Sequence, residues 1–458
     1  MAEALETFSE SWIYLVWMIF LGAFPIVTAM LSVDSSRRFT LDREDGDTSI
    51  LPGPDDLTRA REGFPVLTVI IPARDEEQLL ARTIEAALEI EWPLIDLIVV
   101  NDGSTDSTAD VVSAFIEGSL DDRSAAVDGG GPPAGQRVRL IDNEESMGKA
   151  DSVDSALEQA EGDLVLVLDA DGRPDRRIAE LMAPHFALYP RVIAVTGNPR
   201  VANTDTVLAR LQAIEFSSTV SVLRRAQAGW GRINTVSGIC TMFRRPALVE
   251  MGGFNPRAAT EDIMFSWKAQ LAGWDIFYEP RALFAMHVPT RIGGLFRQRR
   301  RWGRGLGEVL RTFGSTLIKP SSYRMWPVAA EAFLSIIWCL LLVLAVLYWA
   351  VAASLGIPDL GNSPLLDNWG IIVVILSILQ ITWGVHIDAP EDKGITQMLW
   401  VAPLYPLFYW LFNAIAGVSG SIPGLLRGPR GRVTWTPIRT PGPAKEAPGP
   451  KSEAGSPS

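Results

Sequence analysis

Three short polar motifs in this sequence contain residue types that could carry out chemistry together. Asp169-Ala170-Asp171 ends an apolar run, so a buried strand would deliver two carboxylates to the same side at a period of two residues. A Mg²⁺ or Mn²⁺ ion bound through one or two carboxylates usually completes its shell with phosphate and water. A metal-bound diphosphate is therefore the ligand that fits. Lys149 could add a cation for the same phosphates, or it could be an ordinary exposed lysine.

The second motif, Thr260-Glu261-Asp262, follows a glycine-rich turn and opens a helical stretch over 263–272. In one interpretation Asp262 is a general base that takes the proton of an acceptor hydroxyl, which contributes about 10²- to 10⁴-fold to a rate. In the other, Thr260 is a helix N-cap with two acids in the first turn, where the helix dipole favours them. The spacing does not separate these interpretations, and both can hold.

The third motif, Gln298-Arg299-Arg300-Arg301-Trp302, lies in a strongly basic stretch over 291–311. A guanidinium can clamp a diphosphate through paired hydrogen bonds, and a Trp ring can stack on the apolar face of a sugar. The alternative is an interfacial helix that anchors the chain on the cytosolic side of a membrane. We expect only Arg301 to take part in chemistry and the other arginines of the stretch to anchor the helix: Arg291, Arg297, Arg299, Arg300, Arg304 and Arg311.

An α/β domain over 65–312 is predicted to position these motifs. Short continuous runs rich in Val, Ile and Leu are typical of buried parallel strands. Helical spacing between such runs predicts right-handed crossovers and an open doubly wound sheet, which binds ligands beyond the C-terminal ends of its strands. The predicted strands are 67–72, 97–100, 138–141 and 164–168, and the predicted helices between them are 76–88 and 107–116.

Acidic residues cluster where the first two predicted strands end. Arg74-Asp75-Glu76-Glu77 follows the first strand, and Asn101-Asp102-Gly103-Ser104-Thr105-Asp106 follows the second. An acidic residue at such an end can accept hydrogen bonds from a ribose or a base, and Gly103 allows close backbone approach. The alternative is that Asp75 or Asp106 caps the helix that follows.

Four charge-free segments predict an α-helical membrane region. The segment 12–33 is long enough to span and is followed by Arg37 and Arg38, which places the N-terminus outside and the next domain in the cytosol. The segments 332–358 and 369–387 are two further spanning helices. The segment 394–426 contains three prolines and either spans or is re-entrant, so that the basic tail lies outside in the first case and in the cytosol in the second.

The net charge, the cysteines and the histidines further limit the partners and metal sites that this protein can have. With 41 Lys and Arg against 53 Asp and Glu, the net charge of −12 excludes nucleic acid as a partner of the whole chain. The two cysteines lack metal-ligand spacing and are expected to be buried thiols. The three histidines are scattered, and His287 is expected to be a core or rim residue rather than a third metal ligand. We interpret 34–64 as a linker, 118–136 as a flexible insertion and 427–458 as a basic and then disordered tail.

Taken together, the motifs over 65–312 resemble the membrane-embedded processive synthases of glycosyltransferase family 2, which include cellulose, hyaluronan and chitin-oligosaccharide synthases. The short N-terminal membrane region, the late segment 405–410 and Arg432-Val433-Thr434-Trp435 are most similar to poly-β-1,6-N-acetylglucosamine synthases. The resemblance implies a GT-A fold, inversion, a Mg²⁺ or Mn²⁺ cofactor and a UDP-sugar donor such as UDP-GlcNAc. It also implies a growing polysaccharide acceptor, location in the plasma membrane and possible small membrane or export subunits.

The same resemblance implies roles for individual residues. Glu76 and Asp102 would hold the nucleoside, and Asp169 and Asp171 would hold the metal diphosphate together with Lys149 and Arg301. Asp262 would be the base within Thr260-Glu261-Asp262. The acceptor would be contacted by Gln298, Trp302 and Gly238. Two departures put the sugar in question: Arg74-Asp75 stands where Tyr or His followed by Asn is common, and Thr290-Arg291 replaces a frequent Glu-Thr. A single-addition enzyme with a lipid acceptor and a non-catalytic nucleotide-binding scaffold are the alternative functions. A tight turn is the alternative interpretation of Gly238.

Overall fold

The computed structural model describes residues 54–125, 136–355, 368–392 and 394–431. The predicted membrane helix over 12–33, most of the predicted linker and the tail from 432 onward lie outside the described residues. The last part of that linker is helical: α4 (Pro54–Gly63) packs on α8 (Ile178–Leu188), and Arg61 forms an ion pair with Glu180.

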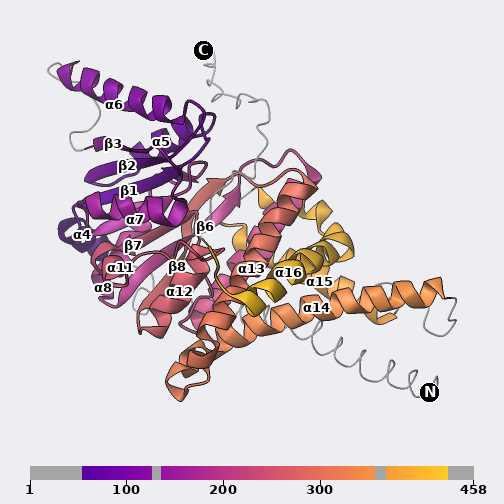
Figure 1. The fold of residues 1–458 in the computed structure, drawn as a ribbon. Coiled ribbons are helices and arrows are strands. Elements are labelled where there is room, and N and C mark those ends of the chain that lie inside the picture. Colours follow the sequence, from indigo (N-terminus) through magenta and orange to yellow (C-terminus); the bar gives the residue numbers. More distant parts are fainter. Residues whose placement is uncertain (1–53, 126–135, 356–367, 393, 432–458) are drawn as a thin grey trace, which may run out of the picture.

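One eight-stranded sheet organises the α/β part, in the order β3-β2-β1-β4-β7-β6-β8-β5 (Figure 1). Its first half agrees with the sequence prediction, since all neighbouring strands there run parallel. The four strands of this half differ in burial. Three are buried along almost their whole length and therefore appear in the sequence as continuous apolar runs, whereas the edge strand over 136–143 is only partly buried. The four strands are β1 (Val66–Ala73), β2 (Leu94–Asp102), β3 (Gln136–Asn143) and β4 (Leu164–Leu168).

The second half of the sheet is mixed, so the doubly wound pattern does not extend through it. Strand β7 (Cys240–Arg244) runs antiparallel to both β4 and β6 (Val192–Val201). Strand β8 (Asp275–Met286) is parallel to β6, and the short β5 (Arg173–Pro174) pairs antiparallel with β8 at the edge. Insertion of β7 beside β4 brings the polar end of β4 next to the segment that precedes β7.

Helices cover both faces of this sheet. Alternate residues of the strands contribute to two apolar layers, as the strand period requires: Val69, Leu97 and Leu166 pack on the side of α5 and α8, whereas Ile70 and Ile98 pack on the side of α7. The helices of this part are α5 (Leu80–Leu88), α6 (Thr108–Ala125), α7 (Lys149–Gln159), α9 (Val207–Glu215), α10 (Val222–Gly229), α11 (Arg245–Glu250) and α12 (Glu261–Leu271), with a π-helical turn η4 (Phe216–Ser221) between α9 and α10.

Two boundaries differ from the sequence prediction. Helix α5 begins at Leu80 rather than at residue 76, because residues 75–77 hydrogen-bond to the loop after β2 instead of to a helical turn. Helix α6 continues to Ala125, so the first part of the predicted flexible insertion is helical, and the rest of it falls on residues outside the description. Cys240 is buried, as expected, whereas Cys339 is only partly buried.

The described residues that follow the sheet are helical (Figure 1). The amphipathic α13 (Ile292–Leu317) leads through η5 (Pro320–Met325) to α14 (Trp326–Ser354). Helix α15 (Asn368–Asp388) follows, and then η7 (Ile395–Val401), η8 (Tyr405–Tyr409) and α16 (Trp410–Arg427). Helix α16 packs along α13 in the most extensive contact between two elements of the described chain.

Among the described residues, one helix, Pro320–Ser354, is long and apolar enough to cross a membrane. The predicted fourth segment is broken: Ile395–Val401 and Tyr405–Arg427 meet at an angle of 60°, a geometry compatible with either a bent span or a re-entrant loop. Both alternatives for this segment therefore stay open, and the number of spanning helices stays a prediction.

Candidate functional site

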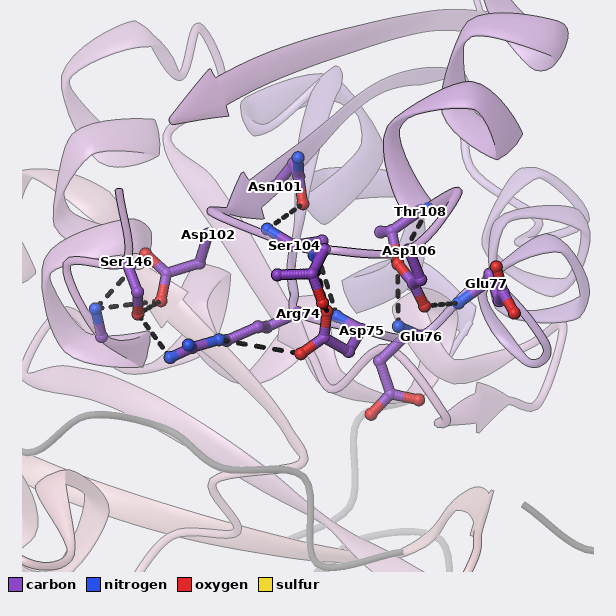
Figure 2. Close-up of polar contacts among 12 residues, drawn as sticks. Arg74, Asp75, Glu76, Glu77, Asn101, Asp102, Ser104, Asp106, Thr108 and Ser146 are labelled. Atoms are coloured by element: carbon purple, nitrogen blue, oxygen red, sulfur yellow. Dashed lines mark hydrogen bonds and ion pairs between the residues drawn. The ribbon is translucent and has the colours of Figure 1, made fainter. Parts of the chain in front are cut away.

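The loops that follow β1 and β2 are hydrogen-bonded into one unit (Figure 2). Asp75 adopts a left-handed backbone with φ of 52°, and its Oδ1 accepts bonds from Thr105 N at 2.7 Å and Thr105 Oγ1 at 3.1 Å. Asp75 therefore joins the two loops and does not cap a helix. Asp106 does cap the start of α6, since its Oδ1 accepts from Thr108 N at 3.0 Å.

Asp102 is completely buried, and its carboxylate fixes the loop before α7. It accepts bonds from Ser146 Oγ at 2.7 Å, Met147 N at 2.7 Å, Gly148 N at 3.0 Å and Ser152 Oγ at 3.0 Å. Asp102 thus positions the segment that carries Lys149, and direct contact with a nucleoside stays a prediction. The carboxylate of Glu76 points away from this network in Figure 2.

The carboxylates of Asp169 and Asp171 lie at the end of β4, as the sequence predicts. Asp169 Oδ1 is 2.5 Å from Lys149 Nζ. Asp171 is buried, and its Oδ2 accepts a hydrogen bond from His287 N at 3.1 Å, with His287 Nδ1 at 4.0 Å. Although His287 was expected to be structural, the fold places it beside one of the two predicted metal ligands.

The residues at this strand end suit a divalent cation bound together with phosphates. Carboxylate oxygens are the ligands that Mg²⁺ and Mn²⁺ favour, and the Asp169 carboxylate already attracts the ammonium of Lys149. Within the described residues, no group of three or more His, Cys, Asp or Glu side chains is arranged to hold a metal by itself. Phosphate and water oxygens would have to complete the shell, as they do for ions bound through one or two carboxylates.

Lys149 connects the predicted metal ligands to the predicted base motif. Its Nζ lies 3.4 Å from Glu261 Oε1 and donates to Gly238 O at 2.6 Å. Burial by itself would lower the pKa of Lys149, but the carboxylates of Asp169 and Glu261 outweigh it and raise this pKa, so the side chain stays protonated. The interpretation of Lys149 as an ordinary exposed lysine is therefore wrong.

The two acids at the start of α12 have opposite pKa shifts. Burial and the neighbouring Glu261 raise the pKa of Asp262 to about 6. Burial would also raise the pKa of Glu261, but Lys149 and Arg301 outweigh it and lower this pKa. A carboxylate whose pKa is raised toward neutrality is suited to accept a proton. Asp262 is held by Ile263 N, which donates to its Oδ1 at 2.8 Å.

Thr260 occupies the N-cap position of α12, but its side chain makes no capping hydrogen bond. Its Oγ1 is buried without a hydrogen-bond partner. Gly238 lies against the Asp262 carboxylate: a Cβ at residue 238 would lie 3.1 Å from Asp262 Oδ2. The absence of a side chain at Gly238 therefore lets the Asp262 carboxylate lie against the backbone that precedes β7.

A small pocket opens beside these groups. Its polar wall consists of Lys149, Glu261, Asp262, Ser237 and Gly238, and its apolar wall consists of Ala150, Val153, Val167, Val236, Phe243 and Phe254. The predicted base and the lysine that contacts Asp169 thus share one pocket.

Helix α13 fixes the segment that leads into α12. Glu308 is completely buried, and its Oε2 accepts from Ala259 N at 2.8 Å, while Arg301 Nη1 donates to Ala259 O at 3.4 Å. Between them, Gly305 lies against Thr260, because a Cβ at residue 305 would be only 1.7 Å from Thr260 Oγ1. Residues 301, 305 and 308 recur at helical spacing and form one face of α13.

A second face of α13 carries Arg299 and Trp302. The Arg299 guanidinium lies 4.3 Å from the centre of the Trp302 ring, and Phe216 meets this ring edge-on at 6.5 Å. Arg299 is buried in an ion pair with Glu215, which corrects the expectation that it anchors the helix at a membrane surface. Arg304 is paired with Glu308 at 2.7 Å. The exposed arginines of the stretch are Arg291, Arg297, Arg300, Arg301 and Arg311, so exposure does not distinguish Arg301 from the arginines expected to anchor the helix. Gln298 is partly buried.

Sequence reasoning did not single out Gly305 and Glu308, and it assigned other roles to Arg299 and His287. A signal existed for Glu308, because it is the only acid in the long basic helix α13. Gly305 also follows Arg301 by one helical turn. No local pattern could have indicated the contact of His287 with Asp171, because 116 residues separate them.

The open mixed sheet with acids at the end of β4 and at the start of α12 defines a glycosyltransferase of the GT-A fold. A mannosyltransferase from Pyrobaculum calidifontis, solved in complex with GDP-Man and Mn²⁺, shares this fold with a TM-score of 0.55 and 21% identity, over 85% of this chain and 99% of that one.

The family described as "Glycosyltransferase like family 2" matches residues 65–305, and the chain belongs to this family. It is 32% identical to a poly-β-1,6-N-acetyl-D-glucosamine synthase of Staphylococcus epidermidis, over 81% of this chain and 86% of that protein. It is 30% identical to the synthase of the same name from Staphylococcus aureus (strain COL), over 91% of this chain and 97% of that protein.

Proposed function

We propose that this glycosyltransferase extends a polysaccharide by inverting transfer from a nucleoside-diphosphate sugar, with UDP-GlcNAc as the donor. The observation that carries the proposal is the shared pocket of Asp262 and Lys149, because Lys149 in turn contacts Asp169. A base and a diphosphate-binding group therefore act on one reacting centre. The names of relatives at 30–32% identity supply the sugar and the polymeric product.

In this mechanism Asp262 takes the proton of the acceptor hydroxyl as its oxygen attacks the anomeric carbon of the donor. Its pKa of about 6 leaves it ionised at neutral pH and still basic enough to assist. Lys149 and Arg301 offset the charge of the departing nucleoside diphosphate. Single inversion requires no covalent sugar intermediate.

Asp169 and Asp171 would hold Mg²⁺ or Mn²⁺, which neutralises charge on the diphosphate when bound. Glu76 and the loop fixed by Asp102 would contact the nucleoside. Trp302 would stack on the acceptor sugar, with Gln298 and Gly238 lining the same side. Thr260 and Glu261 position the base, since one begins its helix and the other contacts Lys149.

For the cell, we propose a multi-pass protein of the plasma membrane with its catalytic domain in the cytoplasm and its N-terminus outside. The apolar helix Pro320–Ser354 supports membrane insertion, and the exposed arginines of α13 support a position at the cytoplasmic surface. The growing polymer would then pass through a channel formed partly by the chain's own helices, with small membrane or export subunits as possible partners.

A donor screen with product sizing tests this proposal. The protein in detergent or nanodiscs is incubated with individual nucleoside-diphosphate sugars and a divalent cation, and products are separated by length. A ladder of oligosaccharides from UDP-GlcNAc is expected. A single lipid-linked product would favour the single-addition alternative, and no nucleoside-diphosphate release with any donor would favour a non-catalytic scaffold. Asp262→Asn is the control that must lose the ladder while it still binds donor.

A further inference from the structure

The ring of Trp302 is contacted on one side by Arg299, which pairs with Glu215, and on another by Phe216, the residue that follows Glu215 in the chain. Glu215 is the last residue of α9 and pairs with Arg299, whose guanidinium lies over the ring. Phe216 is the first residue of the π-helical turn η4 and meets the same ring edge-on. Because π-helical turns are costly and often occur at functional sites, this placement next to a predicted acceptor contact is informative.

Glu215 is the centre of a buried polar cluster rather than half of an isolated ion pair. Tyr409 Oη donates to its Oε2 at 3.0 Å, and Tyr405 Oη and Asn413 Nδ2 donate to its Oε1, each at 3.4 Å. Arg299 also donates to Tyr409 Oη at 3.1 Å. A buried ion pair is favourable only where further hydrogen bonds satisfy its atoms, and here those bonds come from the C-terminal segment.

Three of these partners lie on the far side of the break in the C-terminal apolar segment. Tyr405 is the first residue after the 60° bend, and Tyr409 and Asn413 follow at successive helical turns. The position of this bent segment is therefore linked through Glu215 and Arg299 to the Trp302 ring. Arg297 and Arg300, which lie on α13 beside Arg299, are exposed and do not link the bent segment to Trp302.

We propose that the cluster of Glu215, Arg299, Tyr405, Tyr409 and Asn413 positions Trp302 and makes acceptor engagement depend on the bent C-terminal segment. Arg299 is a positioning residue, since it acts through Trp302 and not on the reacting atoms. The inference rests on the polysaccharide-synthase function proposed above, in which Trp302 meets the acceptor. It predicts that damage to the cluster impairs the use of the acceptor and leaves the use of the donor intact.

Two variants test the proposal from different sides. Tyr409→Phe removes one hydroxyl and keeps the ring. Arg299→Lys keeps the charge but loses the planar guanidinium that lies on Trp302. Both are expected to raise the KM for a soluble oligosaccharide acceptor about ten-fold, the factor that a hydrogen bond to a charged group typically contributes. They should also shorten the product ladder, while the KM for donor stays within about two-fold of wild type, because no donor contact changes.

Arg297→Ala is the matched control, an exposed arginine two residues earlier on α13, and it should behave as wild type. If Arg299 served only to stabilise the fold, Arg299→Lys should behave as wild type, with an unchanged KM for acceptor and an unchanged product ladder. That result, or an unchanged ladder in folded Tyr409→Phe, would overturn the proposal. If Arg299→Lys does not fold, Tyr409→Phe decides alone. Absence of a ladder from the wild-type protein would instead refute the polysaccharide-synthase function itself.

Discussion

Replacing Gly305 by Ala should damage catalysis without touching any substrate. The added Cβ would lie 1.7 Å from Thr260 Oγ1 and 2.7 Å from Thr260 Cβ. Helix α13 cannot move away from Thr260, because the glycines on its opposite side are in close contact with the backbone of α16. A Cβ at Gly307 would lie 2.2 Å from Ser421 O, and one at Gly303 would lie 2.7 Å from Gly417 O. The segment that carries Thr260 must therefore move.

The size of this movement sets the expected loss. Rotation of the Thr260 side chain can move Oγ1 away, but not Cβ, which would lie 2.7 Å from the added atom. Ordinary carbon contacts lie at about 3.5–4.0 Å, so Thr260 has to shift by roughly 1 Å. A misplacement of about 1 Å at a reacting group can cost about 10²-fold in rate. Because Asp262 lies two residues further along, we expect kcat to fall about 100-fold or more. Overpacking should also lower the free energy of unfolding by about 1–3 kcal/mol.

The assay is nucleoside-diphosphate release in detergent, with donor affinity measured by calorimetry. Donor affinity should stay close to wild type, since Asp169, Asp171 and the loops after β1 and β2 are not displaced. Gly314→Ala is the matched control on the same helix, because no atom lies within 4 Å of its added Cβ. Alanine there should raise stability by up to about 1 kcal/mol and leave the rate unchanged. Wild-type kcat in folded Gly305→Ala protein would refute the reasoning.

Further outcomes follow from the charged groups of the site. Asp262→Asn should lower kcat about 10²- to 10⁴-fold and leave donor binding intact, and normal turnover in the purified variant would exclude Asp262 as the base. Because the base acts when ionised, kcat of the wild type should rise as the pH is raised through about 6, and a flat profile would contradict this assignment. Lys149→Met should move this inflection to higher pH, because Lys149 lowers the pKa of Asp262, and the same pH–rate series checks it. Asp171→Ala should weaken donor binding in the presence of Mn²⁺ more than in its absence, as calorimetry would show; equal weakening would argue against metal binding at this residue.

The sequence alone determined the features that depend on local patterns. Continuous apolar runs predicted β1 and β4 at nearly their observed positions, because strands buried on both faces carry no polar alternation. They located only the centres of β2 and of the partly buried edge strand β3, which extend beyond the predicted runs at both ends. The end of such a run also located Asp169 and Asp171, and the glycine-rich turn located the start of α12. The basic helix α13 was visible in its charge, although the role of each arginine was not.

Only the tertiary structure decided which distant residues meet. The antiparallel insertion of β7 beside β4 brings Gly238 to Lys149, 89 residues away. The packing of α13 pairs Arg299 with Glu215 across 84 residues and brings Gly305 against Thr260. Hydrophobic periodicity reports whether a residue is buried, but not what it is buried against. Strand order and helix packing select among partners of equal apolar character. That selection decides that Arg299 is buried in an ion pair while Arg297 and Arg300 of the same helix face solvent.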